Sequence, residues 1–108
     1  MKPSPKLAKL QRLFSQLRDV YDEFPPQTVQ VLLIIAEAGT ITLTDLCEKV
    51  GLTIGAVSRN AGRLADKHNG VKGLGFITVE FAPGSYRQKV AALTPKGDRF
   101  LADLLENL

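Results

Sequence analysis

Few residues of this sequence are of the types that catalyse reactions or bind metal ions. Cys47 is the only cysteine and His68 the only histidine, whereas a metal site needs several Cys or His side chains or paired carboxylates. No general base lies at a suggestive spacing from a serine. Gly73-Leu74-Gly75 precedes an expected strand, not the helix that a phosphate-binding loop requires. We therefore expect no enzymatic activity, no metal and no other cofactor.

Cys47 and His68 each have a structural interpretation beside a regulatory one. Cys47 could be a redox sensor or a small buried side chain, and its place in the motif described below favours the buried side chain. His68 could act as a pH switch. However, it lies on the inward side of a predicted helix, where core or capping histidines are more common.

The basic residues are the other candidates, because they are concentrated in one block. The net charge is only +3, from 14 Lys and Arg against 11 Asp and Glu. Residues 53–97 hold seven basic side chains against two acidic ones, while 25–52 and 98–108 are each net acidic. The seven are Arg59, Arg63, Lys67, Lys72, Arg87, Lys89 and Lys96. This asymmetry favours an anionic partner for that block.

An N-terminal helix within residues 1–24 is the first element expected. Its apolar residues recur at gaps of three and four, which is typical of a helix with a narrow apolar seam. They are Leu7, Leu10, Phe14, Leu17, Tyr21 and Phe24. Pro25-Pro26 should end this helix. The seam either covers the domain's own core or pairs with a second copy, and we favour dimerisation.

The next segment predicts a buried helix followed by two shorter ones. Gln27–Ala38 is apolar almost all round; strand is the alternative, but the length favours a helix closed by Gly39. Ile41 could form a very short strand, and Thr42 then caps a helix that ends at Gly51. Thr53 caps a further helix, which Asn69-Gly70 should end.

The segment from Leu43 to about His68 has the spacing of a helix-turn-helix. Such a motif needs a small residue in its first helix, a glycine four residues later and a β-branched residue six further on. Cys47, Gly51 and Val57 occupy these places.

The outer face of the second helix of this motif is suited to nucleic acid. With Val57, Ala61, Leu64 and His68 turned inward, the outer face consists of Gly55, Arg59, Gly62, Arg63 and Asp66. Arginine forks can bind guanine edges or phosphates, and glycines allow close approach of the backbone. The helix start at Thr53 could hold a phosphate. The alternative is an ordinary solvated face.

A hairpin and a last helix complete the chain. Phe76–Phe81 and Gln88–Leu93 read as two strands joined by the turn-forming residues 82–85. Thr94-Pro95 resembles an N-cap followed by proline at the first helical position. The apolar side of the final helix holds Phe100, Leu101, Leu104, Leu105 and Leu108.

Several of these segments resemble MarR-type winged-helix transcription regulators. The segments similar to their helix-turn-helix are Thr42–Leu46, Gly51–Thr53, Ala56–Arg59 and Leu64. Residues 76–92 resemble the wing, and Leu93-Thr94-Pro95-Lys96-Gly97 resembles the start of the next helix. The resemblance covers roughly residues 27–108. The sequence departs from the pattern where Pro83-Gly84-Ser85-Tyr86 precedes Arg87, since the family's wing usually has an acid there, and the chain is short for the family.

The resemblance implies a homodimer whose recognition helices enter successive major grooves while the wings reach the flanking minor grooves or backbone. It makes Thr53, Ser58, Arg59 and Arg63 recognition-helix contacts and Arg87 the wing-tip arginine. It also admits a small-molecule effector.

The composition sets the wider limits. With 108 residues, 44% hydrophobic, the chain is expected to form one domain with a modest aliphatic core. The longest apolar run, Val31–Ala36, is far shorter than the roughly 20 residues of a membrane span. No secretory signal is visible and a single cysteine cannot form an internal disulfide, so we expect a cytoplasmic protein without a membrane partner.

The sequence thus predicts an α+β winged helix-turn-helix, with a three-helix core and a β-hairpin wing. The chain divides into a dimerisation helix over 1–24, a DNA-binding domain over 25–97 and a C-terminal helix over 98–108, which is also expected to take part in dimerisation. The predicted function is a sequence-specific regulator of transcription, a repressor that binds double-stranded DNA as a homodimer. Its predicted DNA-binding residues are Thr53, Gly55, Ser58, Arg59, Arg63, Lys67, Lys72, Arg87 and Lys89. The alternatives are a winged-helix protein-interaction module and a sequence-indifferent nucleic-acid binder in phage or plasmid DNA metabolism.

Overall fold

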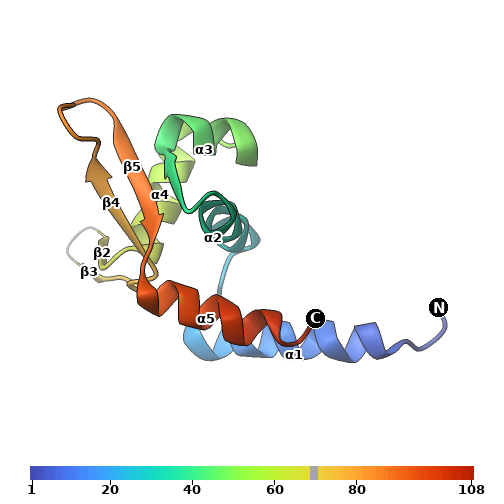
Figure 1. Ribbon diagram of the computed structural model, residues 1–108. Helices are drawn as coiled ribbons and strands as arrows, with labels where there is room; N and C mark the ends of the chain where they lie inside the picture. The colour runs from blue at the N-terminus through green and yellow to red at the C-terminus, as the bar shows by residue number, and fades with distance from the viewer. Residues whose placement is uncertain (69–70) are drawn as a thin grey trace.

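The computed structural model describes residues 1–68 and 71–108, which form a winged body and a helical arm (Figure 1). The body comprises three helices and two small sheets between residues 26 and 94, and the arm comprises α1 (Pro5–Val20) and α5 (Pro95–Leu105). The arm extends away from the body on one side, so the molecule is elongated, measuring 53 × 27 × 22 Å.

The three helices of the body are α2 (Pro26–Ala38), α3 (Leu43–Val50) and α4 (Ile54–Leu64). The predicted N-caps of α3 and α4 are confirmed: Thr42 Oγ1 accepts from the Asp45 N–H at 3.1 Å, and Thr53 Oγ1 accepts from the Ala56 N–H at 3.2 Å. Gly39 ends α2 with a positive φ of 79°. Local sequence chemistry therefore fixes where α3 and α4 begin.

The wing belongs to a three-stranded antiparallel sheet in the order β1-β5-β4. Strand β1 (Thr40–Thr42) is the short strand expected around Ile41, and β4 (Ile77–Phe81) and β5 (Lys89–Leu93) form the predicted hairpin. Ala91 is opposite both Ile41 and Val79. Because Ala91 is fully buried, this register turns one face of the sheet towards the helices.

A single aliphatic core joins the helices to the sheet. Its most deeply buried large side chains, each below 2% exposed, are Val31, Leu32, Ile35, Leu46, Val57, Leu64 and Ile77. They come from α2, α3, α4 and β4, so the core spans the whole body. The predicted aliphatic core is confirmed.

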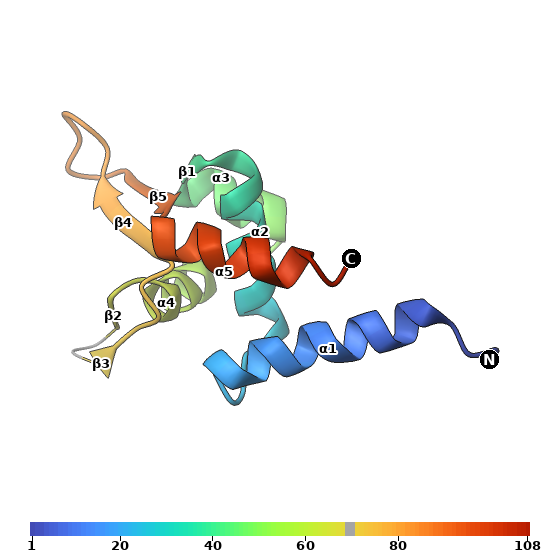
Figure 2. The same ribbon diagram turned by 60° about the horizontal axis from the view of Figure 1, so that its bottom comes forward.

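The arm rests on the body through aromatic rings. The Phe100 ring of α5 stacks on Phe76 at 4.5 Å between centroids and on Phe24 at 6.5 Å. The Asn107 side-chain amide donates to Gln16 Oε1, which ties the end of α5 to α1. Figure 2 shows the N-terminal part of α1 extending beyond the end of α5.

The N-terminal helix ends earlier than its sequence predicts. It stops at Val20, and Tyr21 is extended at φ −149°, whereas Pro25-Pro26 was expected to end it. The Phe24 N–H donates to the Tyr21 carbonyl at 3.1 Å in a turn that brings the Phe24 ring onto Phe100. Packing on α5 thus decides the end of α1. At the other terminus, α5 begins at Pro95, after the predicted Thr94 cap, and not at residue 98.

Helix α4 also ends early, at Leu64, so the prediction of a helix up to Asn69-Gly70 is wrong. Phe76 and Leu74 donate their N–H groups to the carbonyls of Leu64 and Arg63, at 2.7 and 3.0 Å. The chain that returns to the hairpin therefore supplies the partners that a further helical turn would have supplied. Gly73 permits this approach, because a Cβ at residue 73 would lie 2.0 Å from the Ala65 carbonyl oxygen.

After α4 the chain forms a two-stranded ribbon of β2 (Lys67–His68) and β3 (Val71–Lys72). Asp66 and His68 therefore lie beyond the helix, and neither belongs to one of its faces as predicted. The side chains of Lys67 and His68 and residues 69–70 lie outside the part of the chain that is described, so the roles predicted for them stay predictions. Within the described ranges, no helix is both long and apolar enough to cross a membrane.

Candidate nucleic-acid interface

A tight turn between α3 and α4 builds the central feature of the candidate site. Gly51 adopts the left-handed conformation, with φ 73° and ψ 33°, and its N–H donates to the Cys47 carbonyl at 2.9 Å. Val57 is fully buried and Cys47 half-buried. The small residue, glycine and β-branched residue of the predicted helix-turn-helix therefore occupy the expected structural places.

The exposed face of α4 is polar and open. Gly55, Ser58 and Arg59 are exposed, while Val57, Ala61 and Leu64 face the core. A Cβ placed on Gly55 would lie 3.5 Å from Arg59 Nη1, so the arginine side chain runs back along the helix towards its N-terminus. The Arg59 guanidinium therefore lies over the first turn of α4, on its outer surface.

The wing lies next to this face. A surface hollow of about 250 Å³ is lined on one side by α4, through Ser58 and Gly62 among others, and on the other by Val79 and Lys89 of the hairpin. The Lys89 Nζ lies 5.5 Å from the centre of the Phe81 ring, which gives the lysine a preferred direction. Ser58 and Lys89, predicted from separate parts of the sequence, are thus brought together.

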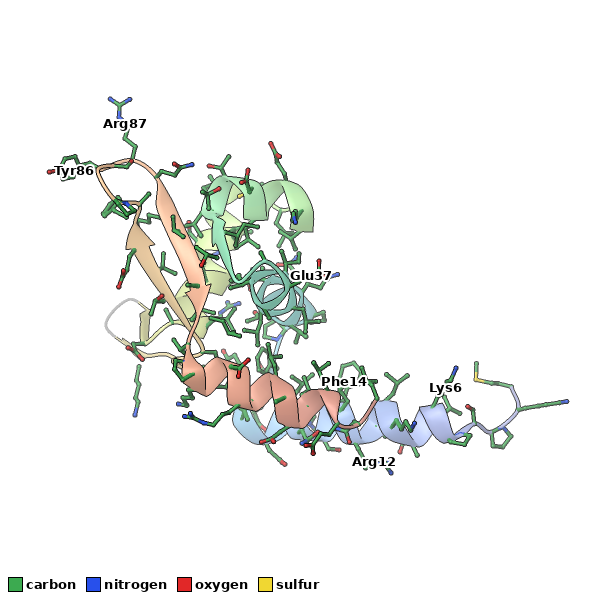
Figure 3. All side chains as sticks on the ribbon, viewed as in Figure 1. Lys6, Arg12, Phe14, Glu37, Tyr86 and Arg87 are labelled. Carbon is green, nitrogen blue, oxygen red and sulfur yellow. The ribbon has the colours of Figure 1, made fainter. Side chains whose placement is uncertain are left out.

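The wing tip carries a second cation. Arg87 and Tyr86 project from the tip away from the body (Figure 3), and Tyr86 is 93% exposed. Ser85 Oγ accepts from the N–H groups of Arg87 and Gln88, at 3.2 and 3.1 Å. Residues 83–86 are the segment in which the sequence departs from the MarR-type pattern. There, the Ser85 hydroxyl fixes the backbone that leads into Arg87.

A buried polar pair behind α4 is the feature that sequence reasoning missed. Thr28 of α2 is fully buried and Asn60 of α4 is 3% exposed, and the Thr28 hydroxyl donates to Asn60 Oδ1 at 2.6 Å. The Arg63 Nη1 also donates to this oxygen, at 3.4 Å. An asparagine inside the apolar stripe of α4 was the available signal, because such a position favours an apolar residue.

Comparison with known proteins agrees with this arrangement. Residues 26–68 match a family model described as winged helix-turn-helix DNA-binding. The structure of RV1404 from Mycobacterium tuberculosis matches with a TM-score of 0.67 and 24% identity, over 86% of this chain and 58% of that one. A mutant MarR from E. coli complexed with operator DNA matches with a TM-score of 0.65 and 20% identity, over 92% and 67%. The chain has the MarR-type winged-helix fold.

Another matching structure contains a small molecule. NadR in complex with 4-hydroxyphenylacetate matches with a TM-score of 0.65 and 18% identity, over 98% of this chain and 74% of NadR. No curated protein sequence gives a significant match. The chain spans 58% of the length of the mycobacterial protein. These comparisons confirm the predicted winged-helix fold.

Not all predicted site residues of this MarR-type fold lie together. Thr53, Gly55, Ser58 and Arg59 share the start and exposed face of α4, and Lys89 is next to them across the hollow. Lys72 is exposed in the β2–β3 ribbon, which Figures 1 and 2 place near the base of the hairpin, far from its tip. Among the described residues, no group of three or more His, Cys, Asp or Glu side chains could hold a metal ion.

Proposed function

We propose that this protein is a homodimeric, sequence-specific regulator of transcription that inserts α4 into the major groove of double-stranded DNA. The observation that carries the proposal is the exposed Arg59 on α4, with its guanidinium over Gly55 and the basic wing alongside. An α-helix fits the width of the major groove, and an arginine fork is the commonest ligand of a guanine edge.

The proposed contacts divide into two classes. Arg59, together with Ser58 and Thr53, reads bases, whereas Arg63, Lys67, Lys72, Arg87 and Lys89 bind phosphates and supply most of the affinity. Ser58 of α4 and Lys89 of the hairpin both line the hollow between these two elements. This supports a single DNA-binding surface, on which Ser58 reads a base while Lys89 binds a neighbouring phosphate. The wing tip reaches the backbone or minor groove that flanks the major groove contacted by α4.

The homodimer is proposed from the arm. Leu7, Leu10 and Phe14 of α1 are 39%, 47% and 57% exposed, and Leu105 and Leu108 at the end of the chain are 51% and 67% exposed. A second copy that covers these side chains would remove them from water. Two α4 helices would then contact half-sites about 34 Å apart, one turn of DNA.

Fluorescence anisotropy with a labelled random duplex, at low and moderate salt, tests the proposal. We expect micromolar binding that weakens steeply as salt rises, because protein cations release counterions from the phosphates. The mass, measured in the same buffer, should be that of a dimer. No binding at low salt would contradict the proposal and favour the protein-interaction module instead.

Repression and an effector form the finer part of the proposal. A dimer bound across a promoter would block transcription by occupying it, and NadR, with the same fold, binds 4-hydroxyphenylacetate. Once a site has been selected from random DNA, a reporter gene placed behind it should be silenced by the protein. Small aromatic acids that weaken binding to that site would reveal an effector. Increased reporter expression would overturn the repressor assignment.

A further inference from the structure

The buried pair of Thr28 and Asn60 links the first turn of α2 to the middle of α4. Both side chains are polar, both lie within the core of the body, and 31 residues separate them along the chain. Buried polar groups are costly unless they are hydrogen-bonded, and an apolar pair of the same shape would pack at similar stability. The pair is therefore suited to a role besides packing.

The direction of the Asn60 amide is fixed by its partners. Its Nδ2 donates to the Ala56 carbonyl at 2.9 Å, and its Oδ1 accepts from the Thr28 hydroxyl at 2.6 Å. A flipped amide would place Oδ1 against the Ala56 carbonyl and an N–H against the donors of Arg63. The oxygen of Asn60 is thus held facing the side chain of Arg63.

Arg63 is the only one of the predicted phosphate-binding residues that the described hydrogen bonds tie to the core. It is half-buried, and its Nη1 donates to Asn60 Oδ1 at 3.4 Å. This distance is longer than the usual N–H···O range, so the bond is weak and gives the guanidinium a preferred direction without fixing it. A guanidinium has five N–H groups, so a bond to Asn60 is compatible with further bonds to a phosphate.

We propose that Thr28 and Asn60 are positioning residues, which hold the Arg63 guanidinium on the flank of α4 in the direction that binds a DNA phosphate. This inference rests on the proposed function and deepens it. Thr28 orients Asn60, Asn60 orients Arg63, and Arg63 makes the contact. Through this relay of Thr28, Asn60 and Arg63, one phosphate contact depends on the packing of α2 against α4.

The test removes the relay without leaving a buried polar group unpaired. In the Thr28→Val/Asn60→Leu variant both partners become apolar, so the fold should persist, as a thermal melt followed by circular dichroism would verify. Binding to a labelled random duplex is measured for this variant, for Arg63→Gln and for the triple variant. Thr28→Ser keeps the hydroxyl and should keep wild-type affinity. Arg99→Gln, on the exposed side of α5, serves as the control for loss of one positive charge.

We expect the relay variant and Arg63→Gln each to weaken binding by on the order of fivefold and to lower the salt slope by about one contact. The triple variant should bind no more weakly than Arg63→Gln alone, because all three changes remove the same contact. If the relay variant does not fold, Thr28→Val alone should show a smaller loss that disappears in the Arg63→Gln background.

Losses that multiply in the triple variant, or wild-type affinity in a folded relay variant, would overturn the relay while leaving DNA binding intact. Absence of binding by the wild-type protein at low salt would instead overturn the proposed function, and the relay with it. The two failures are therefore distinguishable in one set of titrations.

Discussion

The body and the arm differ in how much of their apolar surface a single chain can bury. Helix α2 has 13 residues, of which Thr28, Val31, Leu32 and Ile35 are buried, whereas α1 has 16 residues and buries only Leu17. Helix α2 is apolar almost all round, whereas α1 has only a narrow apolar seam, and part of that seam is exposed in this chain. In addition, the body surrounds α2, while the N-terminal part of α1 extends beyond α5 (Figure 2).

This difference indicates a division of labour. A helix of this length gains most of its stability from packing rather than from propensity. The body has that packing within one chain, whereas Leu10 and Phe14 of the arm remain exposed (Figure 3 labels Phe14). We therefore expect the body to fold and contact DNA and the arm to assemble the dimer, and the following variants test that separation.

The largest effect is expected in the core of the body. Leu46 is fully buried, so Leu46→Ala should lower the free energy of unfolding by about 3 kcal/mol through the lost contacts and the cavity left behind. In urea titrations this loss should be the same at every protein concentration. Leu10→Ala, on the arm, should instead weaken only the dimer, so its effect on the free energy of unfolding should vary with protein concentration. Identical behaviour of the two variants would contradict the division between body and arm.

The second effect concerns assembly. Leu10→Asp/Phe14→Asp places two carboxylates on the exposed apolar face of α1 and should weaken dimerisation by on the order of a hundredfold or more. Sedimentation should then show a monomer, and DNA affinity should fall because one body binds in place of two.

The matched control is Gln11→Asp/Ser15→Asp, which has the same spacing and charge on the same helix but replaces exposed polar residues. It should remain a dimer. If both variants keep the wild-type mass, the arm is not the interface.

The sequence predicts well those structural features that depend only on residues close together in the chain. Thr42, Thr53 and Thr94 each accept a hydrogen bond from a backbone N–H three residues on, and a cap of this kind depends only on the residues around it. The alternation in β4 and β5 and the Gly51 turn are equally local. These signals sufficed to place the helix-turn-helix and the wing.

What the sequence predicts poorly depends on distant packing. Helix α4 ends at Leu64 because Leu74 and Phe76 return to its last carbonyls, and α1 ends at Val20 because Phe24 turns onto Phe100. The Thr28–Asn60 bond joins two helices across the core. The residues that make these contacts are far apart in the sequence, and no local pattern links them. Periodicity alone therefore predicted both helices to be too long, and it did not predict the polar pair.

A third, smaller effect separates recognition from affinity within the body. Arg59→Ala should lower the ratio of specific to random-DNA affinity by about tenfold, because a base contact carries sequence information. The variant should have the same oligomeric state as the wild-type protein, since Arg59 lies on α4 and not on the arm. The measurement is a pair of anisotropy titrations, on a selected operator and on a random duplex. An equal loss on both would show that Arg59 binds phosphate only.

The smallest effect is expected at the wing, where a matched control is available. Lys89→Ala should weaken binding to every sequence by about threefold and lower the salt slope by about one, because Lys89 is proposed to contact phosphate.

Lys96 is its counterpart: each lysine lies over a phenylalanine ring, at 5.5 Å for Lys89 and 5.8 Å for Lys96, but Lys96 is at the start of α5. Lys96→Ala therefore removes the same charge and the same kind of ring contact from the junction between body and arm. If the two variants weaken binding equally, the effect comes from net charge and not from the wing. If only Lys89→Ala does, the DNA-binding surface extends from α4 across the hollow to β5 and excludes the base of the arm.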